Sequence, residues 1–468
     1  MYQSITRALV ASDWERFDFY AKRIKRLSTS RYFPGPALDH SAFRIIELSR
    51  RPLPLLPSLR YLNTFASADH PLWNMSPLLG HKLKHFSLDL FGSKKSLLLN
   101  TSVLASLLVH TPFLEYLQVS NLNSTQQFSS FLSGTLCSLQ HLRVLRLGYT
   151  SLTSECINHL STLSNLADLE ITITRDTNVQ SASATICATS FPALRVLIIR
   201  TELWVIADAF IETYLQPSSL EMVTFRVDEA PMNGHFHRLF TTMRRCCSLR
   251  SLTDIVLSPQ EDVPHDDVLP DHTLNPNTLH ILFAFANLEV LIITTLISFA
   301  NVDNSLIKDM ASAWPSLKTL GIQYFGASSH TTNVTIHGLL PLASCSSLKE
   351  LSINLDATIH NEFPHLRPGR GISNASLSYL AVGQSPITNP YAVASFLSDV
   401  FPKLGIISTG FEEGDAPELG VNEYWEQVKD LFDKFVNIRM QERLWSETAD
   451  RTMYVCCPPP SAKLCHAY

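Results

Sequence analysis

Apolar residues along this chain follow two alternating periods. After Leu142, the alternation of Leu145 and Leu147 is that of a half-buried strand, in which every second side chain points inward. From Thr153 onward the apolar residues lie three or four positions apart, as on one face of a helix. The strand pattern then begins again at Leu166. One short strand and one short helix per unit is the pattern of a leucine-rich repeat.

The same strand pattern recurs through most of the chain. Its first apolar position falls at Leu59, Leu83, Leu114, Leu142, Leu166, Leu194, Leu220, Leu249, Leu288, Leu317, Leu348 and Leu377, with a degenerate copy at Leu404. Most of these positions are 24 to 31 residues apart, a spacing at which the segment opposite the strand is usually a helix. We therefore predict an α/β fold, an open leucine-rich-repeat solenoid (horseshoe) with a parallel concave sheet and outer helices. The sheet should include 116–119, 144–147 and 168–171. A closed eight-stranded barrel also has repeats of this length, but thirteen strand patterns are too many for it.

The repeats also divide the chain into segments. We expect an N-terminal helical and capping segment at 1–58, the solenoid at 59–420, a C-terminal capping helix at 421–448 and a disordered tail at 449–468. An atypical first strand is expected at Ile24 and Leu27, after a short helix. The longest interval, 39 residues between Leu249 and Leu288, contains an acidic, proline-rich loop at 258–277. The capping helix is expected because the last repeat of a solenoid otherwise exposes an apolar end.

Composition and charge narrow the class of function. The 468 residues carry a formal net charge of −5, and the sequence pI is about 6.4. A nucleic-acid-binding domain is expected to have a pI above about 9, so we expect no nucleic-acid partner. The nine cysteines include no CxxC pair, and residues 1–12 lack the pattern of a signal peptide. These features favour an intracellular location, in the cytoplasm or the nucleus.

One apolar stretch, residues 279–302, is long enough to cross a bilayer. It contains His280, Asn287 and Glu289, and an acidic side chain at the centre of a membrane costs about 2.5 kcal/mol or more. The stretch also divides into a helix end and the strand that begins at Leu288. We therefore expect no membrane partner.

No motif for catalysis or cofactor binding is present. The sequence contains no GxSxG, HExxH or glycine-rich phosphate loop. His235 and His237 are the nearest approach to a metal motif, and no third ligand can be assigned to them. An enzyme needs a convergent acid, base and nucleophile, and the sequence nominates none. We predict no enzymatic activity, no catalytic residues, no cofactor and no metal site.

The predicted concave face is the candidate binding surface. The leucines of each strand point inward, so the residues between them line the open side of the sheet. The candidate partner-binding residues at these positions are Tyr61, His85, Tyr116, Gln118, Arg146, Asp168, Glu170, Arg200, Arg226, Gln323, Glu350 and Tyr379, accompanied by Asp89 and Asn354. Tyr and Arg are enriched at interface hot spots, and the mixed charges favour a protein partner over a nucleic-acid backbone.

Several segments give the chain a resemblance to a known family. They are 13–17 (DWERF), 20–24 (YAKRI), 278–291 (TLHILFAFANLEVL), 338–342 (GLLPL) and the helix pattern at 425–443. With them, residues 12–445 resemble the leucine-rich-repeat region of fungal F-box-like proteins of basidiomycetes.

The resemblance implies a ubiquitin-ligase substrate receptor. In that family an N-terminal F-box docks a ligase adaptor, and the repeats are presumed to hold the substrate. The Leu-Pro-x-Glu-Ile-like run that opens an F-box does not precede Asp13, so the F-box itself is missing from this sequence. We expect an adaptor as partner only if an F-box is encoded upstream. The alternative is a stand-alone leucine-rich-repeat inhibitor or regulator of a partner enzyme.

Overall fold

The computed structural model describes most of the repeat region. The described residues are 2–3, 7, 9–28, 37–38, 45, 54–66, 77–90, 110–120, 126–177, 190–215, 219–259, 272–294, 297–323, 332–358, 367–369, 371–409 and 421–456. They belong to two compact units. The first comprises Met1–His265 and Leu269–Ile297, and the second comprises Asp266–Val268 and Ser298–Tyr468.

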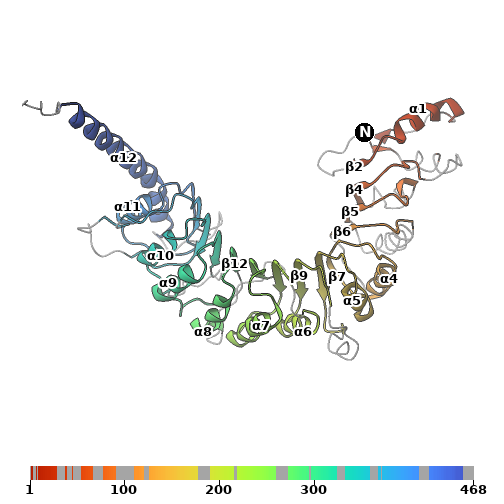
Figure 1. The fold of residues 1–468 in the computed structure, drawn as a ribbon, viewed down its shortest axis with the longest axis horizontal. Coiled ribbons are helices and arrows are strands. Elements are labelled where there is room, and N and C mark those ends of the chain that lie inside the picture. The colour runs from red at the N-terminus through yellow and green to blue at the C-terminus, as the bar shows by residue number, and fades with distance from the viewer. Residues whose placement is uncertain are drawn as a thin grey trace, which may run out of the picture. The chain divides into compact units, whose positions relative to one another are not determined.

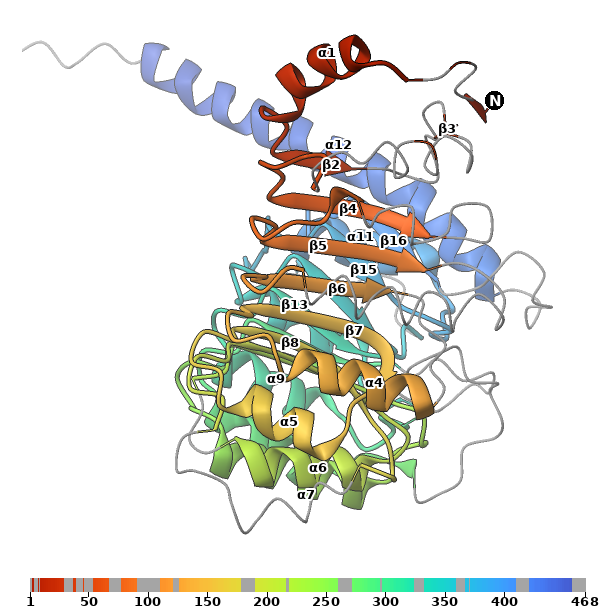
Figure 2. The same cartoon turned by 90° about the vertical axis from the view of Figure 1, so that its right-hand side faces the viewer.

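A parallel sheet of fourteen strands follows the order of the chain (Figure 1). The first unit contributes β2 (Arg26–Ser28), β4 (Tyr61–Ala66), β5 (His85–Leu90), β6 (Tyr116–Ser120), β7 (Val144–Ser151), β8 (Asp168–Ile173), β9 (Val196–Thr201), β10 (Met222–Val227), β11 (Asp254–Ser258) and β12 (Val290–Ile293). The second contributes β13 (Thr319–Ile322), β14 (Glu350–Ile353), β15 (Tyr379–Ala381) and β16 (Ile406–Ser408). Figure 2 shows β4 to β8 stacked side by side. A separate pair joins β1 (Tyr2–Gln3) to β3 (Ala37–Leu38).

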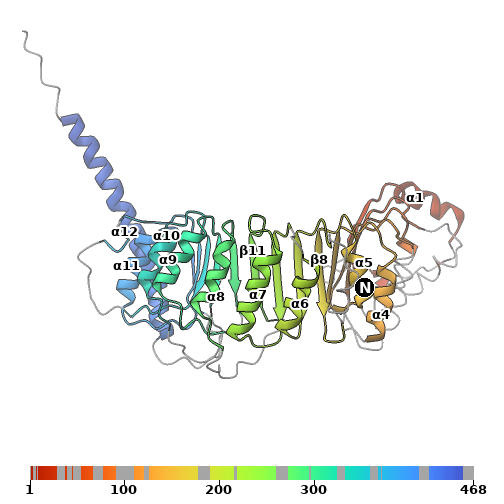
Figure 3. The same cartoon turned by 60° about the horizontal axis from the view of Figure 1, so that its bottom comes forward.

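Helices connect most of the strands and cover one face of the sheet in each unit, while α1 precedes β2 and α12 follows β16. In the first unit they are α1 (Ala11–Ala21), α4 (Gln126–Leu136), α5 (Ser154–Ser161), α6 (Trp204–Tyr214), α7 (Asn233–Cys246), α8 (Pro276–His280) and the 3-10 turn η4 (Ile281–Ala284). In the second they are α9 (Asn304–Ala313), the 3-10 turn η5 (Ile336–Gly338), α10 (Leu339–Ala343), α11 (Pro390–Val400) and α12 (Val421–Cys456). Figure 3 shows α5, α6 and α7 lying side by side as one layer.

The core lies between the sheet and the helices. Leu117, Leu145, Leu169 and Leu197 are aligned across β6 to β9, and none of them is exposed to solvent. Cys156 and the other apolar residues of α5 close the core from the helical side. The repeats therefore form the predicted open α/β leucine-rich-repeat solenoid, and the strands expected at 116–119, 144–147 and 168–171 are confirmed.

The position of one repeat is corrected by the structure. Leu249 was expected to begin the strand pattern, but its side chain is 39% exposed. Leu252 takes that place and is fully buried, and β11 aligns Asp254 with Met222 of β10. Two leucines three residues apart both satisfy the pattern, and the strand pairing selects the second.

Helices precede the first strand of the large sheet and follow its last strand. Helix α1 ends at Ala21. Of the two residues expected in an atypical first strand, Leu27 lies in β2, which pairs with β4, and Ile24 precedes that strand. Helix α12 runs to Cys456, beyond the predicted end at 448.

The first turns of α12 pack against the last repeats. Trp425, Val428 and Phe432 are buried there, and the Trp425 indole donates a hydrogen bond to the Ser385 carbonyl at 2.8 Å. Most of the acidic loop 258–277 and the tail after Cys456 lie outside the described residues.

The corrected repeat position gives a direct stability test. Leu252→Asp should lower the free energy of unfolding by about 3–5 kcal/mol, because a carboxylate would replace a fully buried side chain. Leu249→Asp is the matched control and should cost less than about 1 kcal/mol, because Leu249 is exposed. Urea unfolding of the two variants measures the difference. A larger loss of unfolding free energy for Leu249→Asp than for Leu252→Asp would show that the predicted register, with Leu249 buried, is correct.

Candidate functional site on the open face of the first unit

The helices leave one face of the first unit's sheet uncovered, and we call this surface the open face. Because the strands are parallel and in register, residues at the same position of successive repeats stand about 4.8 Å apart and form columns. One column holds Tyr61, His85, Tyr116, Val144 and Asp168, and the column two residues further along holds Asn63, Ser87, Gln118, Arg146 and Glu170. A third column includes Thr172, Arg200 and Arg226.

The first column begins as a stack of aromatic rings. The Tyr61 and His85 rings are parallel to within 15° with centroids 4.1 Å apart, and His85 and Tyr116 are parallel to within 18° at 3.8 Å. The Arg26 guanidinium caps the stack 4.8 Å from the Tyr61 centroid. At the other end the Tyr116 hydroxyl donates a hydrogen bond of 2.5 Å to the Gln118 side chain. The rings are therefore fixed in place before any partner arrives.

The stack changes the chemistry of His85. Burial between the two tyrosines, followed by the positive charge of Arg26, lowers the pKa of His85 to about 4. The ring is therefore neutral near pH 7 and stacks as an uncharged aromatic group, not as a cation.

Two ion pairs continue the open face after the stack. Arg146 binds Asp168 through Nε at 3.2 Å and Nη2 at 2.5 Å, which raises the pKa of Arg146. Arg200 binds Glu170 through Nε at 2.9 Å and Nη2 at 2.8 Å. The second pair is much less accessible, since the Arg200 and Glu170 side chains are only 8% and 13% exposed.

A bulge in β7 explains why Arg200 is buried. The pairing of β7 with β8 shifts register after Arg146, and Gly148 has a φ of 55°, a conformation that residues with side chains rarely adopt. The bulge brings Tyr149 over the Arg200 guanidinium, 4.8 Å from the ring centroid. Tyr149 itself remains 38% exposed. The sequence predicted an accessible Arg200, and the structure corrects this.

The third column places two arginines opposite each other. Arg226 is aligned with Arg200 on the neighbouring strand. Burial and the positive charge of Arg200 lower the pKa of Arg226. Within the described residues Arg226 has no hydrogen-bond or ion-pair partner, and the buried Arg200 Nη1 has no hydrogen-bond partner either. Among the described residues, Glu170 is the one carboxylate that pairs with either arginine, so this corner of the open face carries excess positive charge.

The middle of the open face is mainly apolar, which the sequence prediction missed, although Asp254 lies between Met222 and Val290. Half-buried side chains on β9 to β12 form this strip: Val196, Ile198, Met222, Val256, Val290 and Ile292. The prediction selected polar and aromatic residues only, although the same alternation that located Arg146 also locates these positions. Arg26 and Tyr149 were missed as well, the first because β2 is short and the second because of the bulge.

The structure therefore separates the predicted residues into three groups. Ten of them, Tyr61, His85, Asp89, Tyr116, Gln118, Arg146, Asp168, Glu170, Arg200 and Arg226, lie on the open face of the first unit. Glu350, Tyr379 and Asn354 belong to the second unit. Gln323, also in the second unit, is only 3% exposed and packs against Gly383, so its predicted role at an accessible surface is wrong.

Metal-binding clusters and membrane-spanning helices were sought among the described residues. No three His, Cys, Asp or Glu side chains among these residues are grouped so as to hold a metal ion. No helix among them combines the length and apolar character needed to span a bilayer.

Comparison with known proteins finds no match by sequence and only distant likenesses among solved structures. No protein-family model matches the chain, and neither does any curated protein sequence. Among solved structures, the crystal structure of the yeast Rad7 and Elc1 complex contains a chain 13% identical, with a TM-score of 0.38 over 86% of this chain and 82% of that one. The TLR13–ssRNA13 complex contains a chain 15% identical, with a TM-score of 0.32 over 80% of this chain and 47% of that one. This chain thus spans about half the length of the second.

The low pKa of His85 predicts a pH-dependent stability. A free histidine has a pKa of about 6.5, so between about pH 6.5 and 4 the unfolded chain binds more protons than the folded chain. The neutral His85 ring therefore makes its full contribution to the free energy of unfolding above about pH 6.5, and this contribution is lost as the pH falls. His85→Phe keeps a stacked ring but cannot titrate. From about pH 7.5 to 5, the natural chain should lose about 1 kcal/mol more unfolding free energy than the variant, a value reduced for partial exposure.

Urea unfolding at both pH values measures this difference. Equal losses in the two chains would mean that His85 titrates normally in the folded protein.

The two ion pairs should differ in their contribution to stability. Arg200→Ala leaves Glu170 buried without its partner and should cost about 3 kcal/mol or more. Arg146→Ala removes a side chain that is 37% exposed and should cost about 1 kcal/mol or less. Thermal or urea unfolding distinguishes the two. Small, equal losses would show that Arg200 is accessible after all.

Proposed function

We propose that this chain is a protein-interaction scaffold and that the open face of the first unit holds its partner. The observation that carries the proposal is the continuous surface from the Arg26–Tyr61 contact to the apolar strip of β9 to β12. It combines fixed aromatic rings, arginines and an apolar centre, and these are the components that dominate protein interfaces.

Preorganisation supports this function. Tyr61 and Tyr116 are held by stacking on His85, and Arg146 is held by two hydrogen bonds to Asp168. Side chains that are already ordered lose less entropy when a partner binds. The apolar strip suits the desolvated centre of a protein interface better than it suits a phosphate backbone. The proposal includes no enzymatic activity.

The unfavourable position of Arg226 in the folded chain also supports the proposal. Like charges directly opposite each other on neighbouring strands are unfavourable, so the position next to Arg200 costs folding free energy. A carboxylate supplied by a partner would relieve this cost. Residues that are unfavourable for folding are expected at functional sites, where binding compensates for them.

The finer proposal is that the chain acts as the substrate-recognition region of an F-box-type ubiquitin-ligase receptor. Its support is the resemblance of residues 12–445 to fungal F-box-like proteins, together with a surface suited to holding a substrate. The substrate would bind the open face, and the adaptor would bind an F-box encoded upstream. The second candidate is a stand-alone inhibitor or regulator, which would use the same face without a ligase.

Affinity capture from the native organism tests both levels of the proposal. Tyr116→Ala/Arg226→Ala should lower the affinity for the captured partner about thirtyfold or more. Arg226→Ala alone should be as stable as the natural chain or more stable, since the Arg200–Arg226 repulsion is removed. Tyr116→Ala should cost some stability, because it removes the stack on His85 and the hydrogen bond to Gln118. The matched control, Tyr391→Ala/Arg244→Ala, removes the same residue types from exposed positions on the helices and should bind normally.

The captured material also separates the two candidates. A ligase adaptor that co-purifies with a bait extended to include the upstream coding sequence supports the substrate receptor. An enzyme captured without an adaptor supports the regulator. Normal binding by the open-face variant, or loss of binding by the control, would contradict the scaffold proposal.

A further inference from the structure

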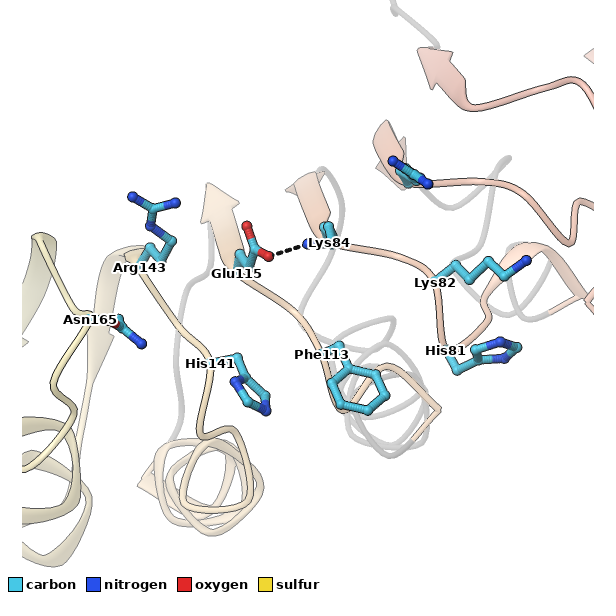
Figure 4. A pocket seen from close by; sticks show the side chains of 9 residues that line it. His81, Lys82, Lys84, Phe113, Glu115, His141, Arg143 and Asn165 are labelled. Atoms are coloured by element: carbon cyan, nitrogen blue, oxygen red, sulfur yellow. Dashed lines mark hydrogen bonds and ion pairs between the residues drawn. The ribbon is translucent and has the colours of Figure 1, made fainter.

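A recess of about 920 Å³ lies at the edge of the first unit where the strands begin, and we call it the rim pocket. Arg60, Lys84, Glu115 and Arg143 immediately precede β4, β5, β6 and β7. In Figure 4 Glu115 points toward Lys84, and Arg143 and Lys82 lie on either side of this pair. None of these residues belongs to the three columns of the open face.

The repeat itself assembles this row. The Lys84 backbone N–H donates to the Arg60 carbonyl at 2.9 Å, Glu115 donates to Lys84 at 2.8 Å, and Arg143 donates to Glu115 at 2.7 Å. These hydrogen bonds hold the four residues at equivalent positions of successive repeats. Their side chains therefore lie in one row along the edge of the sheet.

The rim pocket is basic within an acidic protein. Arg60, Lys82, Lys84 and Arg143 line it against the single carboxylate of Glu115, while the whole chain has a net charge of −5. Lys84 binds Glu115 at 2.5 Å. Arg60, Lys82 and Arg143 are exposed and have no ion-pair or hydrogen-bond partner for their side chains within the described residues. Three cations are thus available to an anionic ligand.

An apolar element accompanies these charges. Phe113 is 52% exposed, and its ring centroid lies 5.5 Å from that of His141 at an interplanar angle of 37°. Figure 4 shows both side chains on the segments that lead into the strands, on the same side of the Lys84–Glu115 pair. Exposing a phenylalanine to water is unfavourable, and an apolar group from a ligand would cover it.

We propose that the rim pocket binds an acidic polypeptide segment that carries an apolar side chain. Carboxylates of the segment would pair with Arg60, Lys82 and Arg143, and the apolar side chain would pack on Phe113. A nucleic acid is a poorer fit, because Glu115 would repel its backbone and one tilted Phe–His pair offers no platform for successive bases. This site is additional to the open face and does not depend on the function proposed for it.

A synthetic probe tests the pocket without knowledge of the natural partner. The probe is a fluorescein-labelled peptide of Asp and Glu residues around one Phe, and its control peptide has Asn and Gln in place of the acids. At about 0.1 M salt, where charges act over about 10 Å, fluorescence anisotropy with the full chain should detect the acidic peptide only.

Two charge-matched triple variants locate the binding. Arg60→Gln/Lys82→Gln/Arg143→Gln should weaken binding about tenfold or more. Arg244→Gln/Lys308→Gln/Lys403→Gln removes the same charge from exposed positions elsewhere and should leave binding unchanged. Because all six residues are exposed, both variants should unfold at the same urea concentration as the natural chain. Phe113→Ala should weaken binding of the Phe peptide but not of an otherwise identical Ala peptide.

Several outcomes would overturn the proposal. They are no binding of the acidic peptide, equal binding of the neutral peptide, and equal losses in the two triple variants. Tighter binding of a single-stranded oligo-dT, lost in the rim variant alone, would assign the pocket to nucleic acid instead. Tyr116→Ala/Arg226→Ala should leave peptide binding unchanged, so failure of this proposal is distinguishable from failure of the open-face proposal.

Discussion

The in-register pairing of parallel strands is the constraint on which the rest of this structure depends. It is fixed by buried leucines such as Leu117, Leu145 and Leu169, which must all reach the same core layer. A shift by one residue would turn each of these leucines to the surface, so the register is strongly specified. Once it is fixed, every surface residue stands about 4.8 Å from its counterparts in the neighbouring repeats. The surface is therefore built from columns, and the chemistry of a column depends on what each repeat contributes.

The columns explain both the stable and the unfavourable features of the open face. Tyr61, His85 and Tyr116 occupy one position in three successive repeats, and flat rings at strand spacing can stack. Opposite charges in adjacent repeats form the Arg146–Asp168 and Glu170–Arg200 pairs, whose members lie on neighbouring strands. The same geometry forces Arg226 beside Arg200. Stacking and ion pairing stabilise the fold where the repeats complement each other, and the two arginines mark the place where they do not.

The sequence is sufficient to predict the repeat, the strands and the column positions, because these depend only on the spacing of apolar residues. It does not distinguish Leu249 from Leu252, since the choice depends on which leucine lets β11 pair with β10. It also does not reveal the burial of Arg200, because the covering ring of Tyr149 arrives through a bulge at Gly148.

The apolar strip and the rim pocket were missed for a different reason. The sequence already contains both rows of residues, but a search for polar and aromatic hot spots along LxxLxL passes over Ile198 and Val256. It also passes over the residue that precedes each strand, such as Arg60 or Arg143. Charge at that position becomes informative only when the backbone hydrogen bonds from Lys84 to Arg60 and from Arg143 to Glu115 place these residues in one row.

The rim pocket and the open face share a boundary, and this has a consequence for how a partner would bind. Arg60 and Tyr61 are consecutive residues, as are Lys84 and His85, so the row of cations adjoins the aromatic stack along its length. A partner with an acidic segment next to a folded surface could occupy both sites at once. Binding of the first site would then raise the effective concentration of the second, and the combined affinity would exceed either one without any new contact. The contribution of the rim would weaken as salt increases, because its cations are exposed, whereas the apolar strip would be much less sensitive.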